Sequence, residues 1–214
     1  GLLRACLHKS SGGSGGVGMT RWTLGLNPGS GGFNYHDPAA ALFDGTTLVA
    51  AAEEERFNRQ KSSAGHFPAQ AIASCLTSAG ITMAEVDRIA VGYAPEQWKN
   101  RLMPEVQRAL QSSGLLHLLD GASPASPTET IQRVNASIAE LSSLVNRYSS
   151  WASPKTAGRR IRQRLGRFDK PVEFVAHHAA HVVASWTMSD YSRAGGLVVD
   201  GVGEAACASG WRLD

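Results

Sequence analysis

Apolar residues follow two different periods along the chain, one typical of strands and the other typical of helices. Short apolar runs predict four strands in the first part of the chain, at 22–26, 39–43, 47–51 and 88–93. The Asp44-Gly45 pair between the second and third runs predicts a tight hairpin turn. After Pro68 the apolar residues repeat every three or four positions until Gly80, which predicts a helix that covers a sheet with one face.

The sequence becomes polar, Ser-rich and helical between residues 95 and 170, and we interpret this stretch as a helical insertion. Ser126, Pro127 and Glu129 predict the start of a helix inside it. Apolar residues spaced by three and four predict a seam against one neighbouring helix, either within the chain or in a homodimer. The seam residues are Ile131, Val134, Ile138, Leu141, Val145 and Tyr148.

The strand pattern returns near the end of the sequence. It predicts a strand at 172–175, a helix that bears three histidines, and a hairpin formed by 196–200 and 205–211. This hairpin repeats the order of strand, Gly-containing turn and strand that is found at 24–43. We therefore predict an α/β protein with a duplicated fold whose second copy is truncated.

The composition is that of an ordinary globular protein, with 214 residues of which 43% are hydrophobic. No stretch approaches the ~18 consecutive apolar residues of a membrane helix, so we expect a cytoplasmic protein with no membrane partner. Cys6, Cys75 and Cys207 lie far apart without CxxC spacing, which indicates neither a disulfide framework nor a zinc ribbon.

Two segments differ from the rest in composition. Residues 1–18 end in a Gly/Ser run, and we interpret them as a disordered leader or tag, with Met19 as the start and 19–214 as one domain fragment. The net charge of +3 arises from 155–170, which holds seven basic residues and one acidic residue. We interpret that segment as a solvated helix face rather than a nucleic-acid site, because the basic excess is local.

Histidines in the last helix are spaced as metal ligands. His177 and His181 stand at i and i+4, so both imidazoles project from one face, whereas His178 points elsewhere. An isolated pair of this kind is more often a coincidence, so a third ligand decides the matter. Asp200 ends the strand after this helix and can complete a His/His/carboxylate set, which suits Fe(II), Mn(II) or Zn(II).

A second group of polar residues follows the first strand. His36 and Asp37 come after a Gly-rich loop, and Pro38 stiffens its exit. One interpretation is that Asp37 only caps a turn. The other is that Asp37 orients or deprotonates a substrate hydroxyl while His36 carries the proton.

Two further segments can contact phosphate groups. Turn glycines such as Gly201 and Gly203, next to Glu204, let backbone N–H groups approach phosphate oxygens, although a Gly-rich turn alone is usually just a hairpin. The acid-base run at 53–61 is typical of a solvated face, but its Arg and Lys side chains can also bind phosphate.

Together these motifs resemble those of a known enzyme family. The matching segments are GLNPGS, HDPAAALFDGTTLVAAAEEERFNRQK, FPAQAIASCLTSAGI, HHAAH and VVDGVGE, in the order that the family has. They resemble the O-carbamoyltransferases that modify nodulation factors, cephamycins and aminoglycosides such as tobramycin. The resemblance covers 23–93 and 172–214, and we find no family motif in 94–171.

The resemblance implies an actin-like or hexokinase-like ATPase fold of the ribonuclease H-like kind, and a two-step reaction. A C-terminal domain joins carbamoyl phosphate to ATP, and the N-terminal domain binds the resulting carbamoyl-adenylate next to a divalent metal, usually Fe²⁺. The carbamoyl group then passes to the hydroxyl of a small-molecule acceptor, in natural-product biosynthesis. By the same resemblance His177 and His181 bind the metal, and Asp200 binds the metal or lies beside the phosphates. Gly201, Gly203 and Glu204 belong to the nucleotide loop.

The resemblance further implies that His36 and Asp37 face the acceptor. The family has another metal-binding Asp later in this domain, as well as the carbamoyl-phosphate domain, so we expect the chain alone to be an inactive fragment. Three alternatives stay open: a tRNA threonylcarbamoyl-transferase-like protein, a non-catalytic nucleotide- or metal-binding module, and a sugar or acetate kinase. The sequence does not identify the acceptor.

Overall fold

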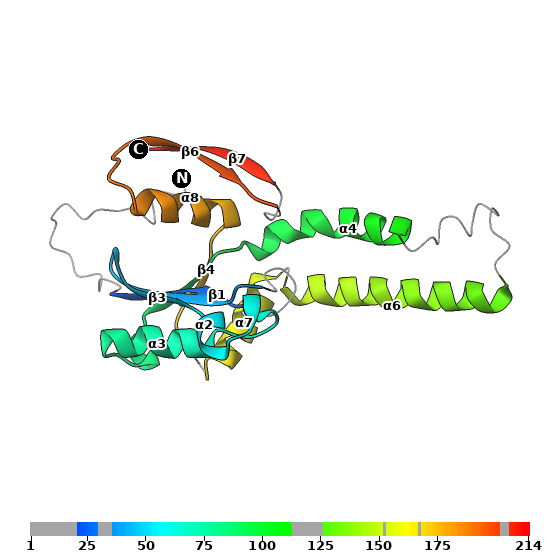
Figure 1. Cartoon of the computed structure of the whole chain (residues 1–214), viewed down its shortest axis with the longest axis horizontal. Coiled ribbons are helices and arrows are strands. Elements are labelled where there is room, and N and C mark those ends of the chain that lie inside the picture. The colour runs from blue at the N-terminus through cyan, green and yellow to red at the C-terminus, as the bar shows by residue number, and fades with distance from the viewer. Residues whose placement is uncertain (1–20, 30–35, 113–125, 152, 167, 202–205) are drawn as a thin grey trace.

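The computed structural model describes residues 21–29, 36–112, 126–151, 153–166, 168–201 and 206–214. The segment 1–18, interpreted from the sequence as a leader, lies outside the described residues. Within them, helix α8 lies between a large sheet and a two-stranded hairpin, and a pair of long helices projects to one side (Figure 1).

The large sheet combines antiparallel and parallel strands. Its strands are β1 (Trp22–Asn27), β2 (Ala39–Asp44), β3 (Thr47–Glu53), β4 (Arg88–Val91) and β5 (Val172–Phe174). The spatial order is β3-β2-β1-β4-β5, with β2 antiparallel to both β1 and β3 and with β4 parallel to both β1 and β5. This mixed sheet confirms the predicted α/β class, and the strands lie where the apolar runs predicted them.

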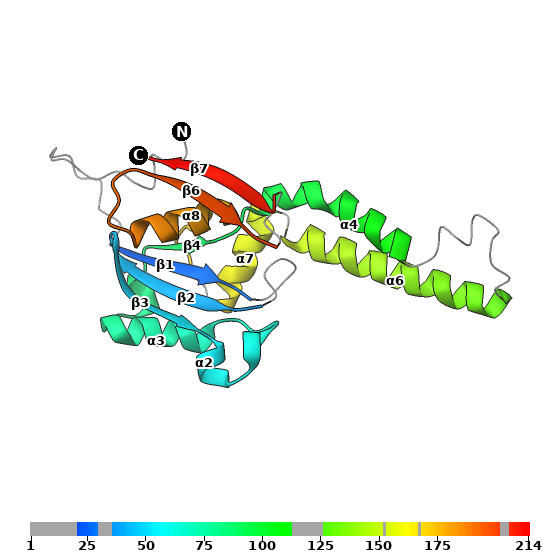
Figure 2. The ribbon, with the colours of Figure 1, turned by 45° about the horizontal axis from the view of Figure 1, so that its top comes forward.

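Helix α3 (Ala69–Ala79) covers one face of this sheet. Its buried residues are Ala71, Ile72 and Cys75, and Gly80 ends it in the left-handed conformation, with φ +67°. Residues of β1, β2 and β4 complete the core beneath it, among them the fully buried Leu24, Leu42 and Ile89. The helix predicted after Pro68, with its apolar face on a sheet, is therefore confirmed (Figure 2).

Short helical turns connect these elements. They are α2 (Glu55–Asn58), η1 (Lys61–Ser63), η2 (Met83–Glu85) and η3 (Pro95–Trp98). Four non-glycine residues adopt positive φ in this part of the chain, namely Asp37, Arg59, Ser62 and Ser63. Such conformations concentrate around the loop that follows β3 and the residue that precedes β2, so this corner has an unusual backbone.

The polar middle of the chain forms α4 (Lys99–Ser112), α6 (Pro127–Trp151) and α7 (Pro154–Arg164). Helices α4 and α6 lie side by side and extend away from the sheet (Figure 1). The predicted seam on α6 is narrower than expected, because Ile131 and Ile138 are 61% and 55% exposed whereas Val134 and Leu141 are half-buried. Helix α7 returns to the main core, where Ile161 is buried.

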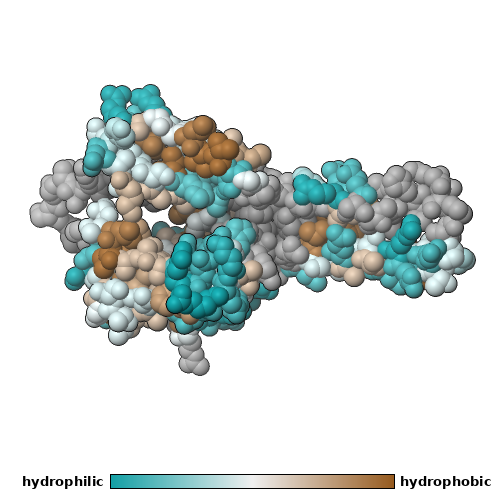
Figure 3. Space-filling model, viewed as in Figure 1, coloured by the Kyte–Doolittle hydropathy of each residue, from teal (hydrophilic) through white to brown (hydrophobic). Residues whose placement is uncertain are grey.

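After β5 the chain forms a second, smaller packing unit. It consists of α8 (His177–Thr187) and the antiparallel strands β6 (Ala194–Val199) and β7 (Ala208–Leu213). Its buried apolar residues are Val182, Val198 and Leu213. Figure 3 shows an apolar surface over the hairpin, where Leu197 and Val199 are 75% and 74% exposed. None of the helices among the described residues is long and apolar enough to cross a membrane.

Candidate metal centre

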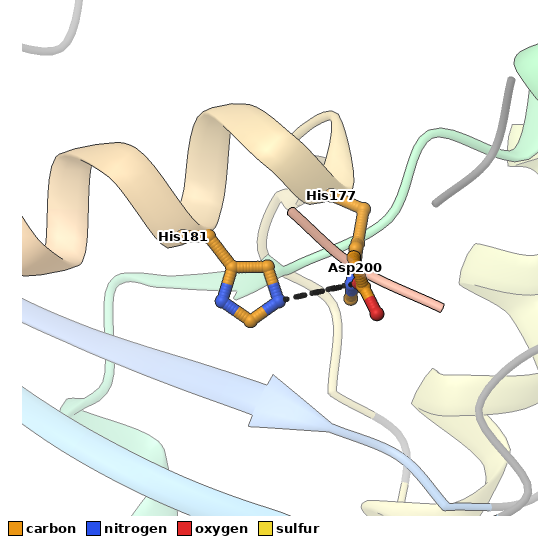
Figure 4. A group of neighbouring side chains, drawn as sticks. All are labelled: His177, His181 and Asp200. Carbon is orange, nitrogen blue, oxygen red and sulfur yellow. Dashed lines mark hydrogen bonds and ion pairs between the residues drawn. The ribbon is translucent and has the colours of Figure 1, made fainter. Parts of the chain in front are cut away.

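Three side chains converge where α8 begins and β6 ends (Figure 4). The Nε2 atom of His177 lies 2.5 Å from Oδ2 of Asp200 and 3.0 Å from Nε2 of His181. The Nε2 atom of His181 lies 3.7 Å from the same carboxylate oxygen. The three residues form a group that can hold a metal ion, as the sequence predicted.

The two elements supply these side chains for simple geometric reasons. His177 and His181 are one helical turn apart, so their imidazoles project from the same side of α8. Asp200 directly follows β6, and its backbone N–H donates a hydrogen bond to the carbonyl of Cys207 at 2.8 Å, which closes the hairpin. The carboxylate is thereby held at the end of the strand that faces α8.

Hydrogen bonding sets the tautomer of His177. Its Nδ1 lies 3.2 Å from the carbonyl oxygen of Gly92. Since a carbonyl and a carboxylate both only accept hydrogen bonds, Nδ1 carries a proton toward Gly92, and Nε2 faces Asp200 either with a second proton or, in the neutral ring, with a lone pair that a metal ion could take. A backbone carbonyl behind a ligating imidazole is the usual outer partner of a metal-bound histidine. The residue missed by sequence reasoning is therefore Gly92, whose role is carried by its backbone.

The donor set fits a divalent metal ion. In the neutral form of His177, a lone pair, a carboxylate oxygen and a second imidazole nitrogen point at one another, and this is stable only with a proton or a cation among them. Ligand atoms bound at about 2.0–2.2 Å from one ion lie roughly 3 Å apart, within the range of separations given above. A His/His/carboxylate set with open positions suits Fe(II), Mn(II) or Zn(II).

The metal-ligand group lies at the carboxyl edge of the parallel strands. Gly92 follows β4 and His177 follows β5 after a short connection, and both strands run parallel to β1. Asn27 ends β1 and pairs with Ala39 at the start of β2, so the loop that contains Asp37 lies at this same edge. Ligand sites in open α/β sheets gather at this edge.

His36 and Asp37 form a pair that is open to solvent. Nδ1 of His36 lies 2.6 Å from Oδ2 of Asp37, and the two side chains are 67% and 52% exposed. The hydrogen bond with His36, helped by one with Ser62 and by the charges of His36 and Lys61, holds the pKa of Asp37 below its ordinary value despite slight burial. The structure describes no contact between this pair and the metal-ligand group.

The backbone of Asp37 is held in a turn. Its φ is +54°, its N–H donates to the carbonyl of Ser62 at 2.8 Å, and its carbonyl accepts from Nδ2 of Asn27 at 2.7 Å. The turn role and an outward-facing carboxylate therefore coexist, and the assignment of His36 and Asp37 to the acceptor stays a prediction.

The acid-base run after β3 is paired within itself. Arg56 lies 3.1 Å from Glu53 and 3.5 Å from Glu55, and Lys61 lies 3.9 Å from Glu55. These contacts favour the solvated face over a phosphate site. Glu54 is different, since it is 4% exposed and accepts the backbone N–H groups of Gln70 and Ala71 at the start of α3.

The predicted nucleotide loop is described only at its start. Gly201 is exposed, and a side chain added there would meet nothing within 4 Å. Gly203 and Glu204 lie outside the described residues. A groove of about 480 Å³ runs beside the metal-ligand group, lined by His181, Trp186, Tyr191, Leu197 and Asp200 among others. This volume is in the range of small-molecule sites.

The chain belongs to the family described as carbamoyltransferase N-terminus, which matches residues 30–214. The uncharacterized protein sll1178 of Synechocystis is 32% identical over 185 residues, which cover 83% of this chain and 26% of that protein. Nodulation protein NolNO of Sinorhizobium fredii is 27% identical over 171 residues, 80% of this chain and 20% of that protein. An uncharacterized 19.2 kDa protein of Rhizobium etli is 40% identical over 72 residues, 34% of this chain and 41% of that protein. The chain thus spans about a quarter or less of the first two relatives.

Proposed function

We propose that the chain is the transfer domain of a metal-dependent O-carbamoyltransferase that moves a carbamoyl group from carbamoyl-adenylate to a hydroxyl of a small-molecule acceptor. The observation that carries the proposal is the convergence of His177, His181 and Asp200 at the carboxyl edge of the sheet. Membership of the carbamoyltransferase N-terminus family supports the reaction class.

We also infer that the two hairpins, β1–β2 and β6–β7, are corresponding parts of an actin-like ATPase fold. Both consist of two antiparallel six-residue strands paired along their whole length. Asp200 stands at the start of the β6–β7 connection, and the β1–β2 connection leaves the sheet at the same carboxyl edge as Gly92 and His177, where a nucleotide phosphate would meet backbone N–H groups. Gly201 and Gly203, with Glu204, would form the second of these turns. ATP and carbamoyl phosphate are then the sources of the carbamoyl-adenylate.

The reaction divides among the residues as follows. His177, His181 and Asp200 would hold a divalent ion, most simply Fe²⁺, which when bound withdraws charge from the carbonyl or from the phosphate. His36 and Asp37 orient the acceptor hydroxyl and take its proton. The hydroxyl oxygen then bonds to the carbamoyl carbon as the bond to the adenylate oxygen breaks, giving a carbamate ester and AMP.

The geometry of Asp37 suits this role. Hydrogen bonds with Asn27 and Ser62 fix the backbone of Asp37. The fixed backbone limits the positions that the exposed carboxylate can reach. The lowered pKa of Asp37 keeps the carboxylate ionised, and His36 bonded to it can receive the proton. A proton carrier that is open to solvent can also release that proton after each turnover.

Metal analysis tests the proposal first. We expect the purified chain to bind one Fe²⁺, Mn²⁺ or Zn²⁺ ion, and the double variant His177→Ala/His181→Ala to lose affinity by more than about 100-fold. The control is His66→Ala, which removes an exposed histidine that does not belong to the group of three. Equal metal binding in the double variant and the control would refute the assigned ligands.

An activity assay tests the reaction class. The gene product, supplied with carbamoyl phosphate, ATP and hydroxyl acceptors, should release AMP and pyrophosphate and form a carbamate, whereas a kinase would release ADP. We expect turnover to require the carbamoyl-adenylate-forming domain as well as these 214 residues. Carbamate formation by a His177→Ala/His181→Ala enzyme at the unmodified rate would rule out the metal-dependent mechanism.

A further inference from the structure

We propose that His178 is a positioning residue, which acts through Ser209 to hold the histidines of α8 in register with Asp200. This inference rests on the proposed metal centre and extends it to residues that do not bind the ion. The ligands come from two elements, α8 and the end of β6, so their convergence depends on how firmly the helix packs on the hairpin.

Apolar packing between these elements is limited. The small core beneath the hairpin has three buried members among the described residues, Val182, Val198 and Leu213, with Val183, Trp186, Ala194 and Trp211 partly buried around them. Gly196 brings β6 close to the helix, since a Cβ there would lie 2.4 Å from a methyl group of Val182. Apolar contacts are non-directional, so they restrain small sliding movements less than a hydrogen bond does.

His178, the residue after the ligand His177, makes such a hydrogen bond. His178 is 7% exposed, and its Nδ1 lies 2.7 Å from Oγ of Ser209 on β7. Nε1 of Trp211 donates to the same hydroxyl at 2.7 Å. Because the indole N–H can only donate, the Ser209 oxygen accepts it, and the hydroxyl proton is available for Nδ1 of His178.

Strand register connects this bond to the third ligand. Ser209 pairs with Val198, which stands two residues before Asp200 on β6. His178 is adjacent to His177 and three residues before His181. The His178–Ser209 bond therefore joins α8 to β7, the strand paired with β6, within a few residues of every ligand.

The second ring nitrogen of His178 makes histidine less favourable for stability at this site than an apolar residue would be. Its Nε2 is buried and has no hydrogen-bond partner among the described residues. An unpaired buried nitrogen is unfavourable, and a Phe or Leu would fill the space without it. The bond made by Nδ1 is therefore the property that distinguishes histidine here from an apolar residue.

Cobalt binding tests the proposal, with Co²⁺ as a metal whose visible bands report ligand geometry. We expect Ser209→Ala and His178→Phe to weaken Co²⁺ affinity by about 10-fold to 100-fold and to alter the bands. Ser209→Thr and His178→Asn, which retain a hydrogen-bonding group at the same place, should restore most of the affinity. The control is Ser78→Ala, which removes a hydroxyl bonded within α3.

The outcomes separate this proposal from the metal centre itself. Wild-type affinity and bands in a folded Ser209→Ala protein, together with lost binding in His177→Ala/His181→Ala, would overturn the positioning role and leave the metal centre standing. Equal losses in Ser209→Ala and Ser209→Thr would also overturn it, because the hydroxyl would not matter. A wild-type protein that binds no Co²⁺ would overturn both proposals.

Discussion

The two packing units of this chain are held together in different ways. The main sheet buries a continuous set of large apolar side chains beneath α3 and α7, whereas the unit of α8, β6 and β7 buries three. In the smaller unit the distinctive contacts are polar, namely those of His177 with Asp200 and of His178 with Ser209. The main sheet thus provides stability, and the smaller unit provides ligands whose arrangement a bound ion would reinforce.

This difference explains where the candidate chemistry lies. A well-packed core fixes the ends of β1, β4 and β5, and so fixes the carbonyl of Gly92 against which His177 is oriented. The smaller unit can adjust to a ligand because few apolar contacts resist its movement. A site formed between a firm and a less firm unit can adapt to a ligand by small local shifts. Substitutions in the two units should therefore have different signatures.

The largest effect on stability is expected for Ile89→Ala in the main sheet. Ile89 is fully buried on β4, where it pairs with Leu24 of β1 and Val172 of β5. Removing its side chain should lower the free energy of unfolding by about 2–5 kcal/mol. Urea denaturation measures this change. The control is Ile138→Ala on α6, which removes a 55% exposed side chain and should change stability by less than about 0.5 kcal/mol. Comparable losses in the two variants would contradict the distinction.

We expect Glu54→Ala to lower the free energy of unfolding by a smaller amount, about 2 kcal/mol. The carboxylate of Glu54 accepts the backbone N–H groups of Gln70 and Ala71 at distances of 3.0 and 2.9 Å, at a helix start where Pro68 provides no side-chain cap. The loss should appear in urea denaturation. The exposed neighbour Glu53 provides the control, since Glu53→Ala leaves these groups bonded. If Glu53→Ala proves as harmful as Glu54→Ala, the capping role is wrong.

Much of this architecture could be predicted from the sequence. The periods of apolar residues located the strands and α3, since these elements bury one face and their patterns record it. The spacing of His177 and His181, with Asp200 after the next strand, predicted a group that the structure brings together. These predictions succeeded because they depend on local geometry and on the edge at which parallel strands end.

Other features had no signal in the sequence. Gly92 acts through its carbonyl, so no side chain marks it. Glu54 stands in a run of charged residues, and only the fold brings it to the start of α3. On α6 the spacing of Ile131 and Ile138 resembles a buried seam, but the pattern does not tell on which side a neighbour lies. Each case depends on residues that are distant in the sequence.

Gly196→Ala sharpens the comparison within the smaller unit. The added methyl group would overlap Val182, whose β-branched side chain has little rotational freedom in a helix, so α8 and β6 must separate slightly. We expect a local cost of about 1–2 kcal/mol. Amide hydrogen exchange should accelerate by roughly tenfold in β6 and β7 but not in β1 or β4. The matched control is Gly210→Ala on β7, where an added Cβ meets nothing within 4 Å. Acceleration of the same size in both variants would count against the close approach.

The smallest effect is expected for Asp37→Asn, and it should depend on pH. The pKa of Asp37 is held below its ordinary value chiefly by the hydrogen bond from His36. A carboxylate whose pKa is lower in the folded state contributes stability that is fully present above about pH 4 and is lost as the pH falls through the folded value. Asn has no such charge and tolerates the positive φ of this position, so the variant should retain the backbone turn.

The measurement is the difference in unfolding free energy between Asp37→Asn and the unmodified chain, from about pH 7 down to about pH 2.5. The difference should be below about 1 kcal/mol at neutral pH, because both side chains are more than half exposed and solvent screens their attraction. It should shrink towards zero at the acid end. A difference that stays constant with pH would mean that Asp37 acts through its turn alone, and would remove the support that its ionised side chain gives to a role in proton transfer.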